Sequence, residues 1–475
     1  MRRSADLWIV NCPAHHPGAS HDPKPHNWRS HEQLSGRSGN LGMSVSPAAN
    51  REQALGKLTG ARTALAGITS VCSAHPLVIE AALRRGLAEN VPVLIEATCN
   101  QVNHEGGYTG MTPMMFRGFV EAIADRVGFP RADLVLGGDH LGPNPWRSLP
   151  SQAAMQQAET MVAAYVEAGF HKLHLDTSMG CAGEAAALAD DVTAMRAARL
   201  AQVSERAMAG GNAPVYIIGT EVPPPGGATH ALDELAVTGA EAARKTLTVH
   251  QTAFAAAGVE SALDRVIGIV VQPGVEFGNA NVAIYQPERA RDLSAALTDM
   301  PGLVFEAHST DYQPASALMA LVEDGFAILK VGPGLTFALR EALYGLDVIA
   351  TELGIAPVGD SLAETMEQLM LSNPGHWQSH YPGAPSEQKL QRHFSYSDRI
   401  RYYWPETAAG SAVDRLYECF VGRDIPETLI SQYLGRLYPL VTSGTIEPRA
   451  EALCLAAIGQ ALDPYYMATR QSPLN

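Results

Sequence analysis

The most constraining feature of this sequence is a series of eight short apolar segments that alternate with longer helical patterns. Each segment has the length of a β-strand and is rich in β-branched residues. Parallel strands joined by helices form right-handed βαβ units, and eight such units in about 290 residues fit a closed barrel. No GxGxxG motif opens the first unit, so an open dinucleotide-binding sheet fits less well. We therefore predict an α/β fold, a (β/α)8 TIM barrel over residues 46–355. The predicted strands are residues 66–71, 91–97, 133–136, 172–176, 215–218, 266–271, 303–306 and 327–331.

Two flanking regions lack this alternation. Residues 1–45 are crowded with Pro, His, Ser and Gly, a composition that buries little surface and predicts a disordered or extra segment. An alternative is that translation begins at Met43, in which case the preceding residues are not part of the protein. Residues 356–475 carry amphipathic segments without strand patterns, which predict a helical C-terminal region.

Composition narrows the class of protein. The 475 residues include 49 acidic and 34 basic ones, and the formal charge of −15 argues against a nucleic-acid partner. Six cysteines occur without a CxxC pair, so neither a disulfide framework nor a cysteine zinc site is indicated. No apolar run approaches the roughly 20 residues that a membrane-spanning helix needs. We expect a cytoplasmic globular enzyme.

Polar side chains follow nearly every predicted strand, which is where the active site of a (β/α)8 barrel lies. The third strand is the richest example, because its apolar residues lead into Gly137, Gly138, Asp139 and His140. Each polar residue alone could instead cap a helix or form a salt bridge, but their joint occurrence favours a site for a divalent metal, with zinc as first choice. The candidate catalytic residues are Asp139, Glu96 and Asp176, and the candidate metal ligands are His140, Glu221 and His308.

Glycine-bearing loops predict where a substrate binds. Residues 330–334 follow the eighth strand and precede a helix, a position where barrels often hold a phosphate on backbone amides, although a plain glycine turn would look the same. Residues 221–230 form a proline-stiffened loop with two glycines, which predicts a lid that carries His230. Arg401 lies in a cluster rich in Arg and Tyr that could bind substrate, pack on the barrel or contact another subunit. The candidate substrate-binding residues are Asn103, Gln272, Lys330, Gly332, Gly334 and Arg401.

A series of long motifs runs through residues 97–111, 137–144, 218–222, 271–277, 306–311, 330–337 and 394–404. This series resembles the Z-type subunit of class II D-tagatose-1,6-bisphosphate aldolase, from about residue 46 onward. The resemblance implies a class II aldolase fold, in which the Asp139-His140 pair is similar to the pair whose Asp moves a proton and whose His binds zinc. It also implies a sugar-phosphate substrate, an oligomer and a catalytic Y-type partner subunit.

Three functions follow from these observations. The resemblance favours a supporting subunit of an aldolase in ketose-phosphate catabolism, of the galactitol or amino-sugar kind. The crowded strand ends favour a stand-alone metal-dependent aldolase or epimerase that acts on a sugar phosphate. The family has also carried the label tagatose-6-phosphate kinase. A kinase is disfavoured because no GxxxxGK[ST] occurs and the nearest fragment, residues 55–58, lacks the upstream glycine.

Overall fold

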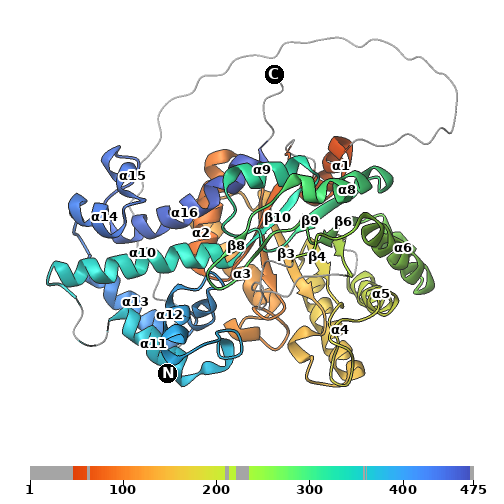
Figure 1. Cartoon of the computed structure of the whole chain (residues 1–475), viewed down its shortest axis with the longest axis horizontal. Helices are drawn as coiled ribbons and strands as arrows, with labels where there is room; N and C mark the ends of the chain where they lie inside the picture. The colour runs from red at the N-terminus through yellow and green to blue at the C-terminus, as the bar shows by residue number, and fades with distance from the viewer. Residues whose placement is uncertain are drawn as a thin grey trace, which may run out of the picture. The chain divides into compact units, whose positions relative to one another are not determined.

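Figure 1 shows the computed structural model of the chain, which describes residues 47–60, 65–208, 213–220, 235–356, 359 and 361–470. Residues Ser44–Asn475 form one compact unit. Three predictions lie outside the described residues: the nature of residues 1–45, the ligand Glu221, and the lid that carries His230. These stay predictions.

Eight parallel strands close into a barrel, which confirms the predicted fold. The strands are β1 (Ile68–Cys72), β2 (Val93–Thr98), β3 (Leu134–Leu141), β4 (Lys172–Leu175), β5 (Val215–Ile218), β6 (Val266–Val271), β9 (Val304–Ala307) and β10 (Ile328–Val331). They neighbour one another in chain order, and β10 closes the barrel against β1, with Ile68 opposite Ile328. Each of the eight predicted apolar runs overlaps one of these strands, because strands buried on both faces have continuous apolar sequences.

The third strand is longer than the sequence predicts. The prediction ended at Leu136, whereas β3 continues to Leu141, with a register irregularity against β4 after Gly138. Glycine is required at position 137, because an added Cβ would lie only 2.6 Å from Glu96 Oε1. Asp139 and His140 therefore belong to the barrel wall itself rather than to a following loop.

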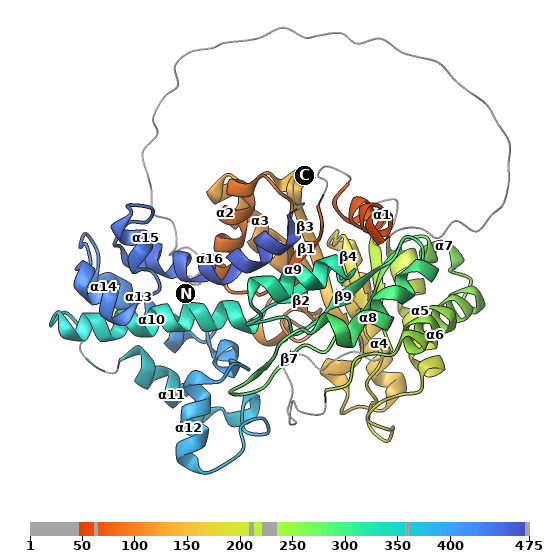
Figure 2. The same cartoon turned by 45° about the horizontal axis from the view of Figure 1, so that its top comes forward.

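Helices follow the strands and surround the barrel (Figures 1 and 2). Their ends carry ordinary sequence signals: the first begins at Pro76 after His75, whose side chain accepts from the Leu77 N–H, and the second begins at Pro113 after the capping Thr112. The helices are α2 (Pro76–Glu89), α3 (Pro113–Val127), α4 (Ser151–Glu167), α5 (Asp190–Ala207), α6 (Ala240–Ala256), α7 (Glu260–Leu263), α8 (Pro287–Ala296), α9 (Ala315–Glu323) and α10 (Pro333–Glu352). After β6 a hairpin of β7 (Glu276–Phe277) and β8 (Val282–Ala283) forms, too short for the sequence pattern to predict.

Helix α1 (Pro47–Thr59) closes the amino ends of the strands. Its residues Ala54, Leu55 and Leu58 pack in one apolar cluster with barrel residues such as Leu94 and Ile217. Asn50 fastens the helix, since its side chain donates to Leu297 O and accepts from the Gly302 N–H. This end of the barrel is therefore filled by a close-packed apolar core.

The C-terminal region is helical, as predicted. It comprises α11 (Leu362–Ser372), α12 (Pro385–Phe394), α13 (Thr407–Cys419), α14 (Glu427–Tyr433), α15 (Tyr438–Thr442) and α16 (Ala450–Thr469). Helix α16 returns to the barrel and packs against α2, α9 and α10, and Tyr465 donates a hydrogen bond to Thr310 O. Whether a domain boundary falls near residue 356 stays a prediction. In the described part of the chain no helix is both long and apolar enough to cross a membrane.

Candidate metal and substrate site

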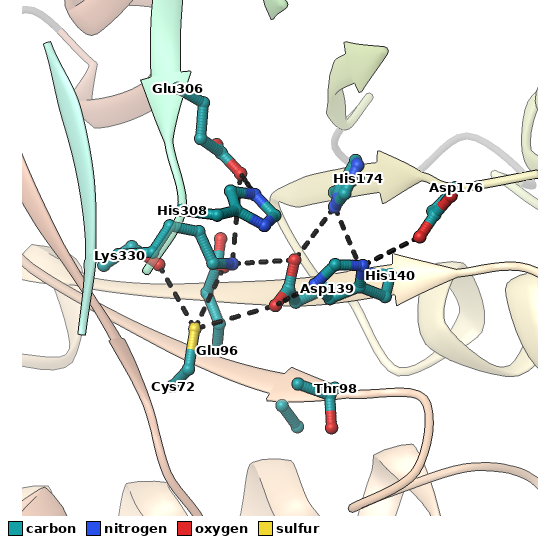
Figure 3. A network of polar contacts seen from close by, with 12 residues as sticks. Cys72, Glu96, Thr98, Asp139, His140, His174, Asp176, Glu306, His308 and Lys330 are labelled. Atoms are coloured by element: carbon teal, nitrogen blue, oxygen red, sulfur yellow. Dashed lines mark hydrogen bonds and ion pairs between the residues drawn. The ribbon is translucent and has the colours of Figure 1, made fainter. Parts of the chain in front are cut away.

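The carboxyl ends of three strands bring three histidines together (Figure 3). His140 comes from β3, His174 from β4, and His308 directly follows β9. Their ring centroids lie 4.9 to 5.2 Å apart, and the residues are 3%, 0% and 5% exposed. The three histidines lie far apart in the sequence. The barrel brings them together because the carboxyl ends of its strands lie on one rim.

A carboxylate holds each of the three imidazole rings. The pairs are His140 Nδ1 with Asp176 Oδ2 at 2.8 Å, His174 Nδ1 with Asp139 Oδ1 at 2.9 Å, and His308 Nε2 with Glu306 Oε1 at 2.9 Å. The His140 backbone N–H also lies 3.2 Å from His174 Nδ1, but an ionised Asp139 has no proton to give, so Nδ1 carries the hydrogen. A carboxylate partner of this kind fixes the tautomer and leaves the other ring nitrogen with a lone pair.

These residues fit a divalent metal. Asp139 and the three histidines each offer a ligand atom, and these atoms all lie within 4.8 Å of one another. His174 Nε2 is buried and makes no hydrogen bond in the described structure, a costly state that a metal ion would relieve. Within this cluster the carboxylates outnumber the ammonium groups by two, which favours a doubly charged cation when the histidines are neutral. The carboxylates are Glu96, Asp139, Asp176 and Glu306, and the ammonium groups are Lys172 and Lys330.

Two lysines alternate with carboxylates beside the histidines. Lys172 Nζ lies 2.5 Å from Glu96 Oε1 and 2.7 Å from Glu306 Oε2, and the residue is 0% exposed. Lys330 Nζ contacts the other oxygen of Glu96 and lies 2.7 Å from Asp139 Oδ1. Burial would lower the pKa of Lys330, but the surrounding carboxylates, Asp139 first, hold it well above its usual range. Lys330 therefore acts as a fixed positive charge.

The electrostatics keep the cluster in defined protonation states. Burial alone would raise the pKa of Asp139, but His140 and Lys330 outweigh it and hold that pKa well below its usual range. Burial would lower the pKa of His140, yet Asp139 and Asp176 outweigh it, so the pKa is raised. Burial dominates at His308 and lowers its pKa to about 4, so this ring is neutral at pH 7 and available as a ligand.

Two residues at the rim adopt left-handed backbone conformations that side chains other than glycine rarely take. His140 has a φ of 50° and Ser309 a φ of 53°. Such conformations cost roughly 1–3 kcal/mol each and concentrate at functional sites. The fold therefore carries local strain at the point where the histidines converge.

A cavity with an empty volume of about 630 Å³, its open mouth included, lies over the cluster. The strand ends contribute Cys72, Asp139, His140, His308 and Lys330 to its lining. From outside the barrel come Tyr108, in η1 (Gly107–Thr109), and Arg401 and Tyr402, in η7 (Arg399–Tyr403). Most of the side chains that line this cavity are polar or charged, which suits a small polar ligand.

Three of the six predicted substrate-binding residues, Lys330, Gly332 and Arg401, line the cavity. Asn103 and Gln272 do not line it, because each side chain organises its own loop: Asn103 Oδ1 accepts from the backbone amides two and four residues further on, and Gln272 Oε1 from those two and three further on. The sequence could not distinguish such loop-forming amides from ligand-binding ones.

The predicted phosphate loop already holds an anion of the protein. The N–H groups of Gly332 and Gly334 donate to Asp311 Oδ1, at 3.0 and 2.7 Å. Burial raises the pKa of Asp311 to about 6. A phosphate at this loop would therefore have to displace Asp311 or use other groups, such as the guanidinium of Arg401.

Three members of the cluster were not among the candidate residues. They are Glu306, on β9, and Lys172 and His174, on β4, which ends one residue before the predicted Asp176. A signal was present, because residues 172, 174 and 176 alternate along a strand and so point to the same side, the barrel interior. Three ionisable residues that point into the barrel interior indicate a functional site rather than a solvent-exposed face of the strand.

Comparison with known proteins identifies the family of this chain. A family model described as "D-tagatose-1,6-bisphosphate aldolase subunit GatZ/KbaZ-like" matches residues 58–470. Over 407 residues the chain is 58% identical to D-tagatose 6-phosphate 4-epimerase of Agrobacterium fabrum (strain C58 / ATCC 33970), which covers 85% of this chain and 95% of that protein. A crystal structure described as a probable tagatose 6 phosphate kinase from Sinorhizobium meliloti 1021 superposes with a TM-score of 0.80 at 59% identity, over 85% of this chain and 100% of that one. The chain therefore belongs to the GatZ/KbaZ-like family of D-tagatose-1,6-bisphosphate aldolase subunits.

Proposed function

We propose that this protein is a divalent-metal-dependent epimerase that inverts C4 of a ketose 6-phosphate such as D-tagatose 6-phosphate. The observation that carries the proposal is the set of three carboxylate-held histidines, with Lys330 beside them, under one cavity. The 58% identity to a D-tagatose 6-phosphate 4-epimerase supports the same choice. An epimerase thus takes precedence over the supporting aldolase subunit that the motif resemblance favours.

The position of C4 determines the chemistry. In a 2-ketose, C4 is not adjacent to the carbonyl, so its hydrogen is not acidic and direct proton removal is unfavourable. The C3–C4 bond can break instead: the C4 hydroxyl loses its proton, C4 becomes an aldehyde, and the bonding electrons form an enediolate over C2 and C3. Rotation about the C4–C5 bond then presents the other face of the aldehyde, and re-forming C3–C4 inverts C4. No atom is lost and no redox step occurs.

The described residues match the needs of this reaction. His140, His174 and His308 would hold the metal, which when bound supplies a Lewis acid for the negative charge on the enediolate oxygens. Lys330 adds a permanent positive charge at the cavity wall. Asp139 lies ionised in the same wall, and it would take up the proton of the C4 hydroxyl.

The test is direct conversion. Purified protein supplied with D-tagatose 6-phosphate, without ATP, should form its C4 epimer, D-fructose 6-phosphate, as followed by 13C NMR. Dialysis against a chelator should abolish the conversion, and one of Zn²⁺, Mn²⁺ or Mg²⁺ should restore it. Absence of conversion with every metal would contradict the proposal.

A supporting aldolase subunit is the second candidate, because the matching family model describes such subunits. Its distinguishing result would be cleavage of D-tagatose 1,6-bisphosphate only when a Y-type subunit is added, with no epimerisation by this chain alone. A kinase would instead consume ATP with tagatose 6-phosphate.

A further inference from the structure

We propose that Tyr402 is a second proton carrier of this site, which serves one configuration of C4 while Asp139 serves the other. This inference rests on the proposed C4 epimerisation. It gives a chemical role to η7, a segment that comes from the C-terminal helical region and reaches the cavity from outside the barrel.

The reaction itself requires two proton carriers. The C4 oxygen points in opposite directions before and after the aldehyde rotates, because C3 attacks the two faces in turn. A side chain fixed in the barrel wall can reach the oxygen in only one of these positions, since proton transfer needs hydrogen-bond distance. The second carrier must therefore come from another side of the cavity.

The described lining offers two tyrosines from outside the barrel, Tyr108 and Tyr402. The rings contact each other edge to face, with centroids 4.7 Å apart. Tyr402 differs from Tyr108 in its surroundings. Its Oη accepts a hydrogen bond from Arg401 Nη2 at 3.1 Å, and the guanidinium groups of Arg401 and Arg399 lie 4.5 and 5.1 Å from its ring centroid. Such positive surroundings stabilise a phenolate.

The groups that face Tyr402 come from three elements. Arg399 and Arg401 belong to η7, Tyr108 to η1, and the ring of His376, in η6 (Pro374–His376), stacks on it at 5.0 Å. Burial alone would raise the pKa of Tyr402, but Arg401 and Arg399 outweigh it and hold that pKa below its usual range. Burial raises the pKa of Tyr108 well above its usual range, and burial also lowers the pKa of His376, which keeps that ring neutral. Of the two tyrosines, Tyr402 is thus the better acid.

The proton balance closes without a co-reactant. In one direction Asp139 takes the C4 hydroxyl proton as C3–C4 breaks. After rotation, the enediolate electron pair re-forms C3–C4, and the aldehyde oxygen takes the hydroxyl proton of Tyr402. Arg401 and Arg399 stabilise the resulting phenolate, and exchange with water at the open mouth returns both residues to their starting states. In the reverse direction the exchange with water comes first and leaves Tyr402 as the phenolate and Asp139 protonated. Tyr402 then takes the C4 hydroxyl proton, and Asp139 gives its proton to the aldehyde oxygen after rotation.

The experiment compares Tyr402→Phe with Tyr403→Phe. Tyr403 is the neighbouring residue of η7; its hydroxyl donates to Asn373 O, and it does not belong to the described cavity lining. Each variant, loaded with metal, is assayed for epimerisation and for reduction of hexacyanoferrate(III), which oxidises an enediolate as it forms. Both C4 epimers, D-tagatose 6-phosphate and D-fructose 6-phosphate, serve as substrates, and a reaction without sugar phosphate corrects for oxidation of thiols.

For Tyr402→Phe we expect kcat for epimerisation to fall by about 100-fold or more, with KM little changed. Hexacyanoferrate reduction should persist with one epimer and disappear with the other, because only one epimer depends on Tyr402 for cleavage. The wild type and Tyr403→Phe should reduce hexacyanoferrate(III) with both epimers. Epimerisation by Tyr402→Phe within about threefold of wild type, or an equal loss of reduction with both epimers, would overturn the inference. Failure of the wild type to interconvert the epimers would instead contradict the proposed function.

Discussion

The two ends of the barrel use the same eight strands in opposite ways. On β2 the inward-facing Leu94 is 0% exposed in an apolar cluster under α1, whereas Glu96, two residues later, is 0% exposed in a network of charges. Buried charges and strained backbone are costly, whereas close apolar packing is the main source of stability. The apolar packing at the amino end therefore stabilises the fold enough to offset the cost of burying charged groups at the carboxyl end.

The largest expected effect comes from the carboxyl end. His174→Ala should remove one metal ligand and reduce epimerase activity by at least about 1000-fold, or ~4 kcal/mol of transition-state stabilisation. Metal content by elemental analysis should fall in parallel. His250→Ala is a matched control, because His250 is also 0% exposed but lies on α6. Full metal content and activity in His174→Ala would contradict the assignment of this cluster.

The amino end should show the reverse behaviour. Leu94→Ala removes a fully buried side chain from the apolar cluster and should lower the free energy of unfolding by about 2–5 kcal/mol. Below its unfolding temperature the variant should keep kcat within about twofold of wild type, because the lost packing lies away from the reacting atoms. Chemical denaturation and steady-state kinetics measure the two quantities. A fall in kcat without a loss of stability would show that the ends are not independent.

The two ends also differ in how far sequence alone predicts them. Apolar runs predict the strands and the closed barrel, because burial on both faces demands such residues. The convergence of Glu96, Asp139, His140 and His308 follows from the rule that active sites lie at strand ends. Which carboxylate holds which histidine does not follow, since it depends on strand register and on side-chain geometry across neighbouring strands.

The loop after β10 shows another interaction that the sequence alone does not predict. Its glycines predict amides that point at an anion, and they do so, but the anion is the carboxylate of Asp311 from the loop after β9. No local pattern reveals a partner that lies more than 20 residues away in the sequence. The reach of Arg401 into the cavity likewise depends on how the C-terminal region folds back over the barrel.

An intermediate effect should come from Asp176→Asn, which removes the charge behind His140. Metal affinity at pH 8 should fall by about 10–100-fold, because the ring loses its carboxylate partner. In the wild type the pKa of His140 is raised, so metal binding is complete above that pKa and is lost as pH falls through it. The substitution lowers this pKa, and the acid limb should move to lower pH. Competition with a chromophoric chelator over a pH series measures both changes, and an unmoved acid limb would contradict the pairing.

The smallest effect should come from Asp311→Asn, which keeps an oxygen to accept from the Gly332 and Gly334 amides. Asp311→Ala leaves both amides without that acceptor and should cost roughly 1–3 kcal/mol of unfolding free energy. Because burial raises the pKa of Asp311 from 3.8 to about 6, its stabilising contribution is present below pH 3.8 and is lost as pH rises through 6. Stability of the wild type relative to Asp311→Asn should therefore decline across that window in denaturation experiments.

The same pair of variants decides how the substrate phosphate binds. If Arg401 and other cavity groups hold it, KM for the sugar phosphate should be nearly equal in wild type and Asp311→Asn. If the amides of Gly332 and Gly334 hold it, Asp311→Ala should lower KM, because the competing carboxylate is gone and the amides are free to bind an anion. A lower KM in Asp311→Ala would restore the glycine loop after β10 as the phosphate site, in place of Arg401 of η7.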